Sequence, residues 1–205
     1  MTSLPLRMFA GAAMLAGALC SSLAPAGAQT TRVRGTIDAI VGQTLDVATR
    51  EGPMIALRIS ETTRLSAVVK ATLADIKPGS YVGIAALPRP DGTQLALEVL
   101  IFPEAMRGAG EGHRPWDLLP ESTMTNATVA ETVQKVDGQA LTLTYKDGSK
   151  TVVVPPEAPI VTFAPAERAE LKPGTRVFAN VTITNDGVNT VNNLVVGREG
   201  VDPPM

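Results

Sequence analysis

The sequence predicts an all-β fold with short helices, built as two copies of one small domain. Three observations support this prediction. Apolar and polar residues alternate in short runs, as expected of half-buried strands. Glycine and proline separate these runs at short intervals. Finally, a stretch that begins near Val33 recurs near Val129 with its landmarks in the same order.

The repeat is defined by four pairs of landmarks, separated first by 96 and then by 95 residues. They are Val41-Gly42-Gln43-Thr44-Leu45 with Asp137-Gly138-Gln139-Ala140-Leu141, Glu51-Gly52 with Asp147-Gly148, Lys77-Pro78-Gly79 with Lys172-Pro173-Gly174, and Asp91-Gly92 with Asp186-Gly187. The predicted organisation is a signal peptide (1–28), a first repeat (29–102), an inter-repeat linker (103–125), a second repeat (126–200) and a tail (201–205).

The N-terminus has the features of a secretory signal peptide. Arg7 precedes an apolar stretch, and Ala26-Gly27-Ala28 is a small-x-small cleavage motif. We therefore expect cleavage after Ala28 and a periplasmic or secreted protein. Two alternatives remain, a lipoprotein attached through Cys20 and an uncleaved anchor, although the apolar stretch is shorter than the roughly 20 residues of a membrane span. No later segment is apolar and long enough to span a membrane, and cleavage would leave no cysteine.

The strands are expected in the same order in each repeat. In the first repeat the apolar positions are Val33, Ile37 and Ala39; Leu45 and Val47; Ile55, Leu57 and Ile59; Val82, Ile84 and Ala86; and Leu95, Leu97, Val99 and Ile101. In the second they are Val129 and Val133; Leu141 and Leu143; Val152 to Val154; Val177 to Val181; and Val191 to Val196. Each repeat thus reads as three strands followed later by two.

Turn and helix signals lie between these strands. Asp-Gly at 91–92 and 186–187 indicates hairpins, and Lys-Pro-Gly at 77–79 and 172–174 suits a type II turn. Residues 71–76 and 166–171 are good helix formers and precede those turns. A helix between the third and fourth of five strands is the order of an OB-type barrel. The predicted fold is therefore two tandem five-stranded OB-like barrels.

The repeat also resembles a family of bacterial exported tandem OB-like domains of unknown function. The residues that carry the resemblance are Gly35-Thr36-Ile37, Gly42-Gln43-Thr44-Leu45-Asp46-Val47, Ile76-Lys77-Pro78-Gly79, Asp91-Gly92 and Ala96-Leu97-Glu98-Val99. In the second copy Glu131 replaces the glycine and Val191 the alanine. Some members carry a metal-transporter permease label, which would require membrane-spanning helices. These motifs consist of turn and core residues, so the resemblance implies a fold more than an activity.

The linker holds the only histidine and the only tryptophan of the chain. One hypothesis makes it a binding loop at a seam between the two barrels, with candidate binding residues Arg107, His113, Arg114, Trp116 and Asp117. The alternative is a Gly/Pro-rich linker that Trp116 and Leu118 anchor to one barrel, because tryptophan buries much apolar area.

Composition argues against several function classes. Without residues 1–28 the chain has 17 basic and 20 acidic residues, a balance that does not favour a nucleic-acid partner. It holds one imidazole and no thiol, so no metal site or cofactor is predicted. No nucleophile elbow or histidine-paired serine indicates an enzyme.

The sequence therefore predicts an exported, non-enzymatic binding or adaptor protein of the bacterial envelope, whose partner is an envelope protein or a small ligand. One alternative is a periplasmic hydrolase or transferase that uses scattered carboxylates. A second is a copper carrier that uses Met106, His113 and Met124.

Overall fold

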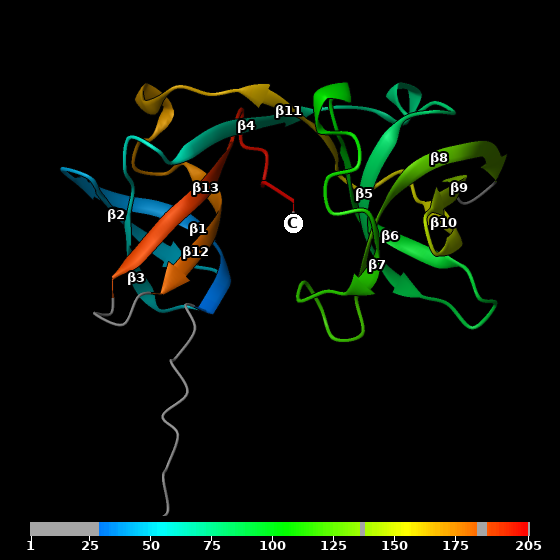
Figure 1. Ribbon diagram of the computed structural model, residues 1–205, viewed down its shortest axis with the longest axis horizontal. Helices are drawn as coiled ribbons and strands as arrows, with labels where there is room; N and C mark the ends of the chain where they lie inside the picture. Colours follow the sequence, from blue (N-terminus) through cyan, green and yellow to red (C-terminus); the bar gives the residue numbers. More distant parts are fainter. Residues whose placement is uncertain (1–28, 136–137, 184–187, 205) are drawn as a thin grey trace, which may run out of the picture.

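The structure, a computed structural model, describes residues 29–135, 138–183 and 188–204 (Figure 1). The all-β prediction is confirmed, because thirteen strands of the described residues join in one mixed sheet. The helices of the described part are three 3-10 turns of three residues each. The predicted signal peptide with Cys20 and the Ala28 cleavage site, and the predicted turn residues Asp137 and Asp186-Gly187, lie outside the described residues.

The elements follow one another in the same order in both repeats. The first contains β1 (Gln29–Val41), β2 (Thr44–Thr49), β3 (Met54–Arg58), β4 (Arg64–Lys70), η1 (Leu73–Asp75), β5 (Tyr81–Pro88) and β6 (Gln94–Ile101). Next come η2 (Glu104–Met106) and β7 (Gly112–Pro115). The second contains β8 (Thr123–Lys135), β9 (Gly138–Tyr145), β10 (Gly148–Val154), β11 (Ile160–Pro165), η3 (Arg168–Glu170), β12 (Arg176–Ile183) and β13 (Asn189–Gly197).

The strands close into two rings, and each ring takes strands from both repeats. In the first ring, β1 pairs with β2, β2 with β3, β3 with β13, β13 with β12 and β12 with β1. In the second ring, β8 pairs with β9, β9 with β10, β10 with β6, β6 with β5 and β5 with β8. Figure 1 shows the rings as two lobes, with the first ring on the left.

Two tandem barrels, one from each repeat, are therefore not confirmed. The last two strands of each repeat close the ring of the other copy. The exchange has a simple physical basis: both copies carry the same strand pattern, so β5 and β6 fit the edge of β8 as well as that of β1. The pattern within one repeat does not distinguish these two partners.

The predicted three strands before each helical turn were one too few. The additional strands, β4 and β11, pair antiparallel with each other and connect the two lobes (Figure 1). Each also runs parallel to the last strand of the other copy, β4 beside β13 and β11 beside β6. At the centre of the β4–β11 ladder, Val68 lies opposite Phe163, its own equivalent 95 residues later. The two copies are therefore related by a local two-fold axis at this pair.

In the first strand of each repeat, equivalent residues are separated by a different number of residues than the sequence suggested. A bulge lies between Ile37 and Ala39 in β1 and between Val129 and Glu131 in β8. Ile37, and not Val33, is therefore the residue of the first repeat that corresponds to Val129. Likewise, Glu131 corresponds to Ala39 and not to a glycine. The β8–β9 hairpin is longer and restores the spacing of 96 further on. With this alignment, Arg34 in β1 corresponds to Asn126 in β8.

Each ring encloses its own apolar core. Leu45, Leu57 and Leu194 are fully buried in the first, and Leu141 and Leu143 in the second. A third cluster lies at the two-fold axis and includes Val68, Leu100, Val161, Phe178, Val195 and Val201. Burial of such a side chain contributes about 1.5–3 kcal/mol to stability. The third cluster contains side chains from strands of both repeats, so it binds the lobes together.

The predicted type II turns agree with the structure. Gly79 and Gly174 have φ of 90° and 85°, the positive values required at the third turn position. Ser80 and Thr175 donate backbone hydrogen bonds to the Lys77 and Lys172 carbonyls at 2.9 and 3.0 Å. The expected helices at 71–76 and 166–171 are only the 3-10 turns η1 and η3. Each is closed by a carboxylate, Asp75 or Glu170, that accepts from a preceding backbone N–H.

The strand exchange can be tested with an engineered disulfide. Thr30 in β1 lies opposite Thr182 in β12. In a Cys20→Ser background, we expect Thr30→Cys with Thr182→Cys to form an intrachain disulfide, because Cα atoms of directly opposed residues are close enough to be bridged. The control pairs Thr30→Cys with Leu87→Cys, the equivalent position if each repeat closed its own ring. Mass spectrometry of the oxidised proteins should show a crosslink in the first variant. Crosslinking in the second variant alone would contradict the exchange.

The second prediction concerns acid stability. The Glu170 carboxylate accepts from Arg198 Nε and Nη2 at 2.7 and 2.8 Å and from the Glu167 N–H at 2.9 Å. These bonds, those from Arg198 foremost, lower the pKa of Glu170 to about 2. Because the pKa of Glu170 is lower in the folded protein, its ionised carboxylate stabilises the folded state at pH values above 4.5. This stabilisation is lost as the pH falls toward 2 and the carboxylate becomes protonated. Glu170→Gln should therefore lower the melting temperature at pH 7, and the difference should shrink between pH 4.5 and 2. A difference independent of pH would contradict this assignment.

Candidate functional site

The linker folds against the second ring and is held there as a strand. β7 pairs antiparallel with the start of β8, so that His113 lies opposite Thr125 and Arg114 opposite Met124. Successive residues of a strand point to opposite faces. His113 therefore faces one side of this ribbon, and Arg114 faces the other side with Met124. The two faces carry different candidate residues to different surroundings.

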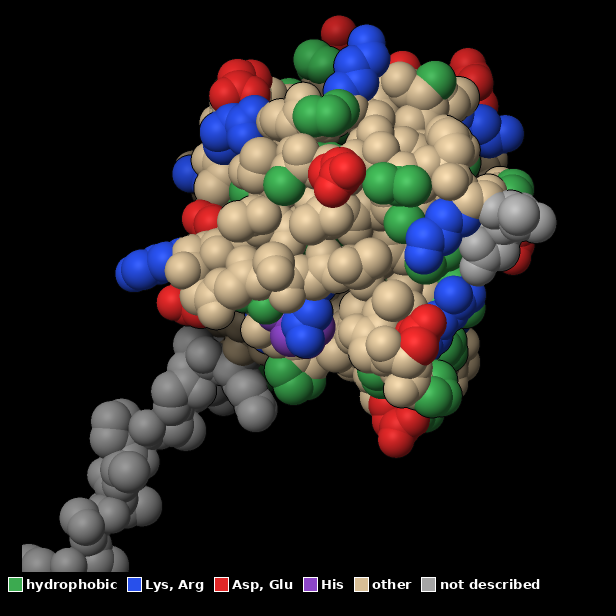
Figure 2. Space-filling model, turned by 90° about the vertical axis from the view of Figure 1, so that its right-hand side faces the viewer, with side chains coloured by type: hydrophobic (Ala, Val, Ile, Leu, Met, Phe, Trp, Pro, Cys, Tyr) green, Lys and Arg blue, Asp and Glu red, His purple; other side chains and the backbone are tan. Residues whose placement is uncertain are grey.

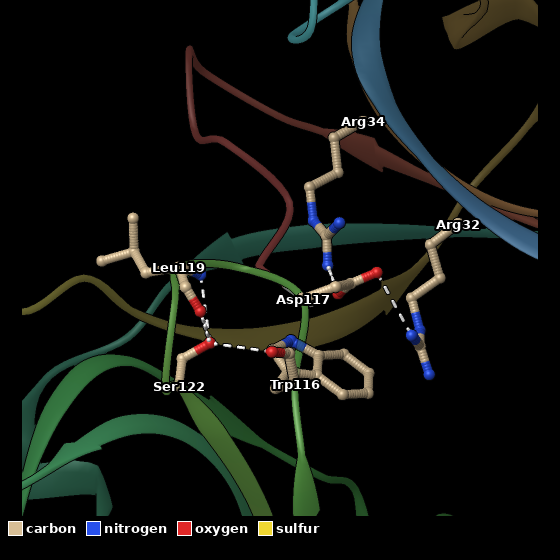
Figure 3. Close-up of polar contacts among 6 residues, drawn as sticks. All are labelled: Arg32, Arg34, Trp116, Asp117, Leu119 and Ser122. Carbon is tan, nitrogen blue, oxygen red and sulfur yellow. Dashed lines mark hydrogen bonds and ion pairs between the residues drawn. The ribbon is translucent and has the colours of Figure 1, made fainter.

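A tight loop after β7 presents Trp116 and Asp117 to the first ring (Figure 3). The buried Ser122 hydroxyl organises this loop, because it accepts from the Leu119 N–H at 3.0 Å and contacts the Leu119 and Trp116 carbonyls at 2.7 and 3.1 Å. The backbone N–H of Trp116 in turn donates to the Ser122 carbonyl at 2.8 Å. Figure 3 shows Arg32 and Arg34 reaching from β1 toward this loop.

Asp117 joins the two lobes by ion pairs. Its carboxylate accepts from Arg34 at 2.8 Å and from Arg32 at 3.2 Å. Partial burial raises the pKa of Asp117, but the hydrogen bonds and charges of Arg34 and Arg32 outweigh it and lower the pKa below its usual value. The side chain of Arg34 is only 7% exposed, so this pair is better shielded from water than an ordinary surface ion pair. We refer to this contact between the Trp116–Asp117 loop and β1 as the seam.

Cations lie close to aromatic rings at the seam. The Arg32 guanidinium carbon is 3.9 Å from the centre of the Trp116 ring, and that of Arg114 is 5.6 Å from the same ring. Arg34 lies 5.4 Å from the centre of the Phe178 ring. Such cation–π contacts contribute about 0.5–2 kcal/mol each. They fix the orientation of the indole at the edge of a cavity.

This cavity is small, partly enclosed and walled almost entirely by carbon. It has a volume of about 40 Å³, and its walls include Gly83, Phe102, Arg114, Trp116, Asn126 and Pro204. Two buried polar atoms of its lining residues, Trp116 Nε1 and Asn126 Oδ1, have no hydrogen-bond partner among the residues that the structure describes. Asn126 is 6% exposed and its amide nitrogen donates to the Ala109 carbonyl at 3.0 Å. That bond orients the amide, so its oxygen is the acceptor left over.

The cavity exists in the second ring because the two copies differ there. Gly83 in β5 corresponds to Phe178 in β12, and Asn126 corresponds to Arg34. In the first ring the Phe178 ring and the Arg34 side chain lie together. In the second ring a Cβ on Gly83 would come within 2.9 Å of Asn126 Oδ1 and 3.0 Å of the Phe102 ring. The glycine therefore leaves space that a larger residue would remove.

The five predicted site residues are only partly brought together. Arg114, Trp116 and Asp117 meet at the seam. Arg107 instead pairs with Glu104 at 2.6 Å and donates to the Gly79 carbonyl at 2.8 Å, which ties η2 to the turn before β5. His113 lies on the other face of β7, where Nδ1 is 2.8 Å from Thr125 Oγ1 and the ring stacks on Tyr145.

The surroundings of His113 do not favour the copper alternative. Burial, together with the charges of Lys150 and Arg114, lowers the pKa of His113. Met124 lines the cavity on the opposite face, so these two proposed ligands point away from each other. Among the described residues, no group of three or more His, Cys, Asp or Glu is arranged to hold a metal ion.

Sequence reasoning missed four residues of the site: Arg32, Arg34, Gly83 and Asn126. A signal for the arginines existed, because Arg32 and Arg34 flank Val33 on the solvent side of a predicted strand.

The outer face of the second ring shows acidic and basic side chains interspersed and hydrophobic ones scattered (Figure 2). The seam differs from this outer face, because two arginines and a carboxylate gather there around an indole ring.

Comparison of this chain with protein-family models, with curated proteins and with solved structures finds no match. In the part of the chain that the structure describes, no helix is long and apolar enough to cross a membrane.

The seam ion pairs give a stability prediction. Asp117→Asn keeps the shape of the side chain but removes the charge that Arg34 and Arg32 contact. We expect the free energy of unfolding at pH 7 to fall by about 1 kcal/mol, a value reduced from that of a buried charged hydrogen bond because Asp117 is half exposed. Urea titration would measure it. Glu104→Gln, in the more exposed Glu104–Arg107 pair, is the matched control and should change stability less. An equal loss in both variants would contradict a special role for the seam.

Proposed function

We propose that this chain is an exported, non-enzymatic binding protein of the bacterial envelope, and that it binds a small ligand in the cavity at the seam. The observation that carries the proposal is the pair of buried, unpartnered polar atoms, Trp116 Nε1 and Asn126 Oδ1, among the residues that line this apolar cavity. Leaving a buried donor or acceptor unpaired costs about 1–3 kcal/mol. A ligand that pairs with both atoms would recover that cost.

The chemistry of the cavity defines the class of ligand. An indole N–H only donates, and an amide oxygen only accepts. A hydroxyl group or a primary amide has the matching acceptor and donor in one compact group. A cavity of about 40 Å³ has room for such a head group and a few carbon atoms, so the rest of the ligand would extend along the seam beside Arg114.

The export and fold parts of this proposal rest on separate support. The Ala26-Gly27-Ala28 motif after an apolar stretch supports signal cleavage and an envelope location. Rings of five strands, with a helical turn before the last two strands of each repeat, support assignment of each ring to the OB type. Small ligands commonly bind in sites that are apolar with a few convergent polar groups, and the seam cavity has that composition.

The experiment uses the single tryptophan, whose fluorescence reports on the seam alone. A panel of small alcohols and primary amides would be titrated while the Trp116 emission is followed. We expect a saturable change with at least one member. By protein-observed NMR, Trp116→Phe should weaken binding of that compound tenfold or more, because it removes the donor but keeps a ring. The same variant should lower the melting temperature only slightly, because the smaller ring keeps part of the contact with Arg32 and Arg114 and the lost donor has no partner among the described residues.

Tyr145→Phe, next to His113 and outside the cavity, is the matched control and should bind like the unaltered protein. The proposal fails if no hydroxyl or amide compound gives a saturable signal. It also fails if Trp116→Phe binds as tightly as the unaltered protein.

A further inference from the structure

A second hollow, larger and more polar, lies on the first ring. Its volume is about 390 Å³, and its lining includes Arg34, Thr36, Arg50, Arg176 and Asp202. It is separate from the seam cavity, because no residue lines both. Arg34 is paired with Asp117 and Arg176 with Asp202, so Arg50 is the arginine of this hollow whose charge no described carboxylate balances.

The corresponding place on the second ring is filled by the chain itself. Arg34, Arg50 and Arg176 correspond there to Asn126, Lys146 and Tyr81. The segment before β7 covers these residues: the Ala109 carbonyl accepts from Tyr81 Oη at 3.2 Å and from Asn126 Nδ2 at 3.0 Å. Glu111 Oε1 accepts from the Lys146 N–H at 3.0 Å. A turn followed by a carboxylate, that of Glu111, thus occupies the second ring's version of the hollow.

The same stretch continues as an added strand. Gly112 to Pro115 forms β7 and pairs with Thr123 to Asn126 of β8, whose other side pairs with β5. The equivalent residues of β1 pair with β12 on one side. On their other side the ladder with β2 begins only at Gly35, although the Arg34 carbonyl accepts from the Arg50 N–H at 2.8 Å. In the described part of the chain, the backbone edge from Thr30 to Val33 has no strand alongside it.

The charge of the hollow indicates what would lie there. Arg176 already donates to a carboxylate, that of Asp202 in the C-terminal segment, at 2.9 Å. Arg50 is exposed, and no hydrogen bond or ion pair of its side chain occurs with any described residue. Arginine binds carboxylates through paired N–H groups. The first ring therefore combines an open strand edge with cationic groups that suit acidic side chains.

We propose that this hollow binds an extended acidic peptide segment of a partner protein, which adds as a strand beside Thr30–Val33 of β1 and places carboxylates on Arg50 and Arg176. Strand addition supplies affinity through backbone hydrogen bonds, and the arginines supply selectivity. The chain's own segment on the second ring is the internal precedent. This site does not depend on the seam cavity or its ligand.

The test uses a synthetic blocked peptide, acetyl-Thr-Glu-Val-Glu-Thr-Glu-Val-amide, and the isotope-labelled protein. We expect saturable binding with amide shift changes at Thr30–Val33. Arg50→Glu should weaken binding tenfold or more, because it replaces attraction by repulsion. Lys146→Glu is the matched control, since the equivalent position on the second ring is already covered, and it should bind like the unaltered protein.

Four results would overturn the proposal. Equal affinity in Arg50→Glu and the unaltered protein would exclude the arginine contact. Equal binding of a backbone N-methylated peptide would exclude strand addition. Identical shifts with sodium glutamate, at matched carboxylate concentration, would reduce the hollow to a site for free anions. Self-association of the protein alone, measured by sedimentation velocity, would assign the edge to a second copy of this chain.

Discussion

Closure of each strand ring depends on strands from both repeats, and the other features follow from that constraint. A sheet edge with unpaired N–H and C=O groups is open to unwanted pairing, and here β12–β13 and β5–β6 cover the edges of the opposite copy. The exchange forces the chain to cross twice between the lobes, at β4 and β11. These crossings pair with each other, and a third apolar cluster forms around them. The two lobes therefore share strand pairings and an apolar cluster, which hold the two sides of the seam next to each other.

The seam differs from the rest of the structure because the two copies differ there. At one position the first ring has Phe178 beside Arg34, and Gly197 is the residue equivalent to Phe102. The second has Gly83 beside Asn126 and Phe102. The phenylalanine ring comes from β12 in the first ring and from the residue that follows β6 in the second. Gly197, the equivalent of Phe102, could not carry a side chain, because a Cβ there would collide with the Val201 carbonyl. This rearrangement leaves a small cavity and two unpartnered polar atoms on one side, and a packed arginine on the other.

The strand order, the turns and the core were predictable because they depend on local patterns: alternation at Leu45 and Val47, and Lys-Pro-Gly before β5. The partner of each strand was not, because both copies present the same pattern to β5 and β6. β4 and β11 were missed since their apolar runs, such as Ala67 to Val69, lack clear alternation. Trp116 and Asp117 were predictable as unusual residues in a linker. Asn126 and Gly83 were not, because their importance comes from which residues stand at the equivalent places in the other copy.

The opposition of Val68 to Phe163 has a consequence for how freely each half of the chain can vary. These residues occupy the same place in their repeats, so the geometry is that of a homodimer in which two half-length chains exchange their last two strands. In such a dimer one residue type would have to face its own copy across the axis. A single chain has no such requirement, so each half is free to change alone. A small valine can face a large phenylalanine at the axis, and a cavity can open in one lobe while its counterpart stays filled.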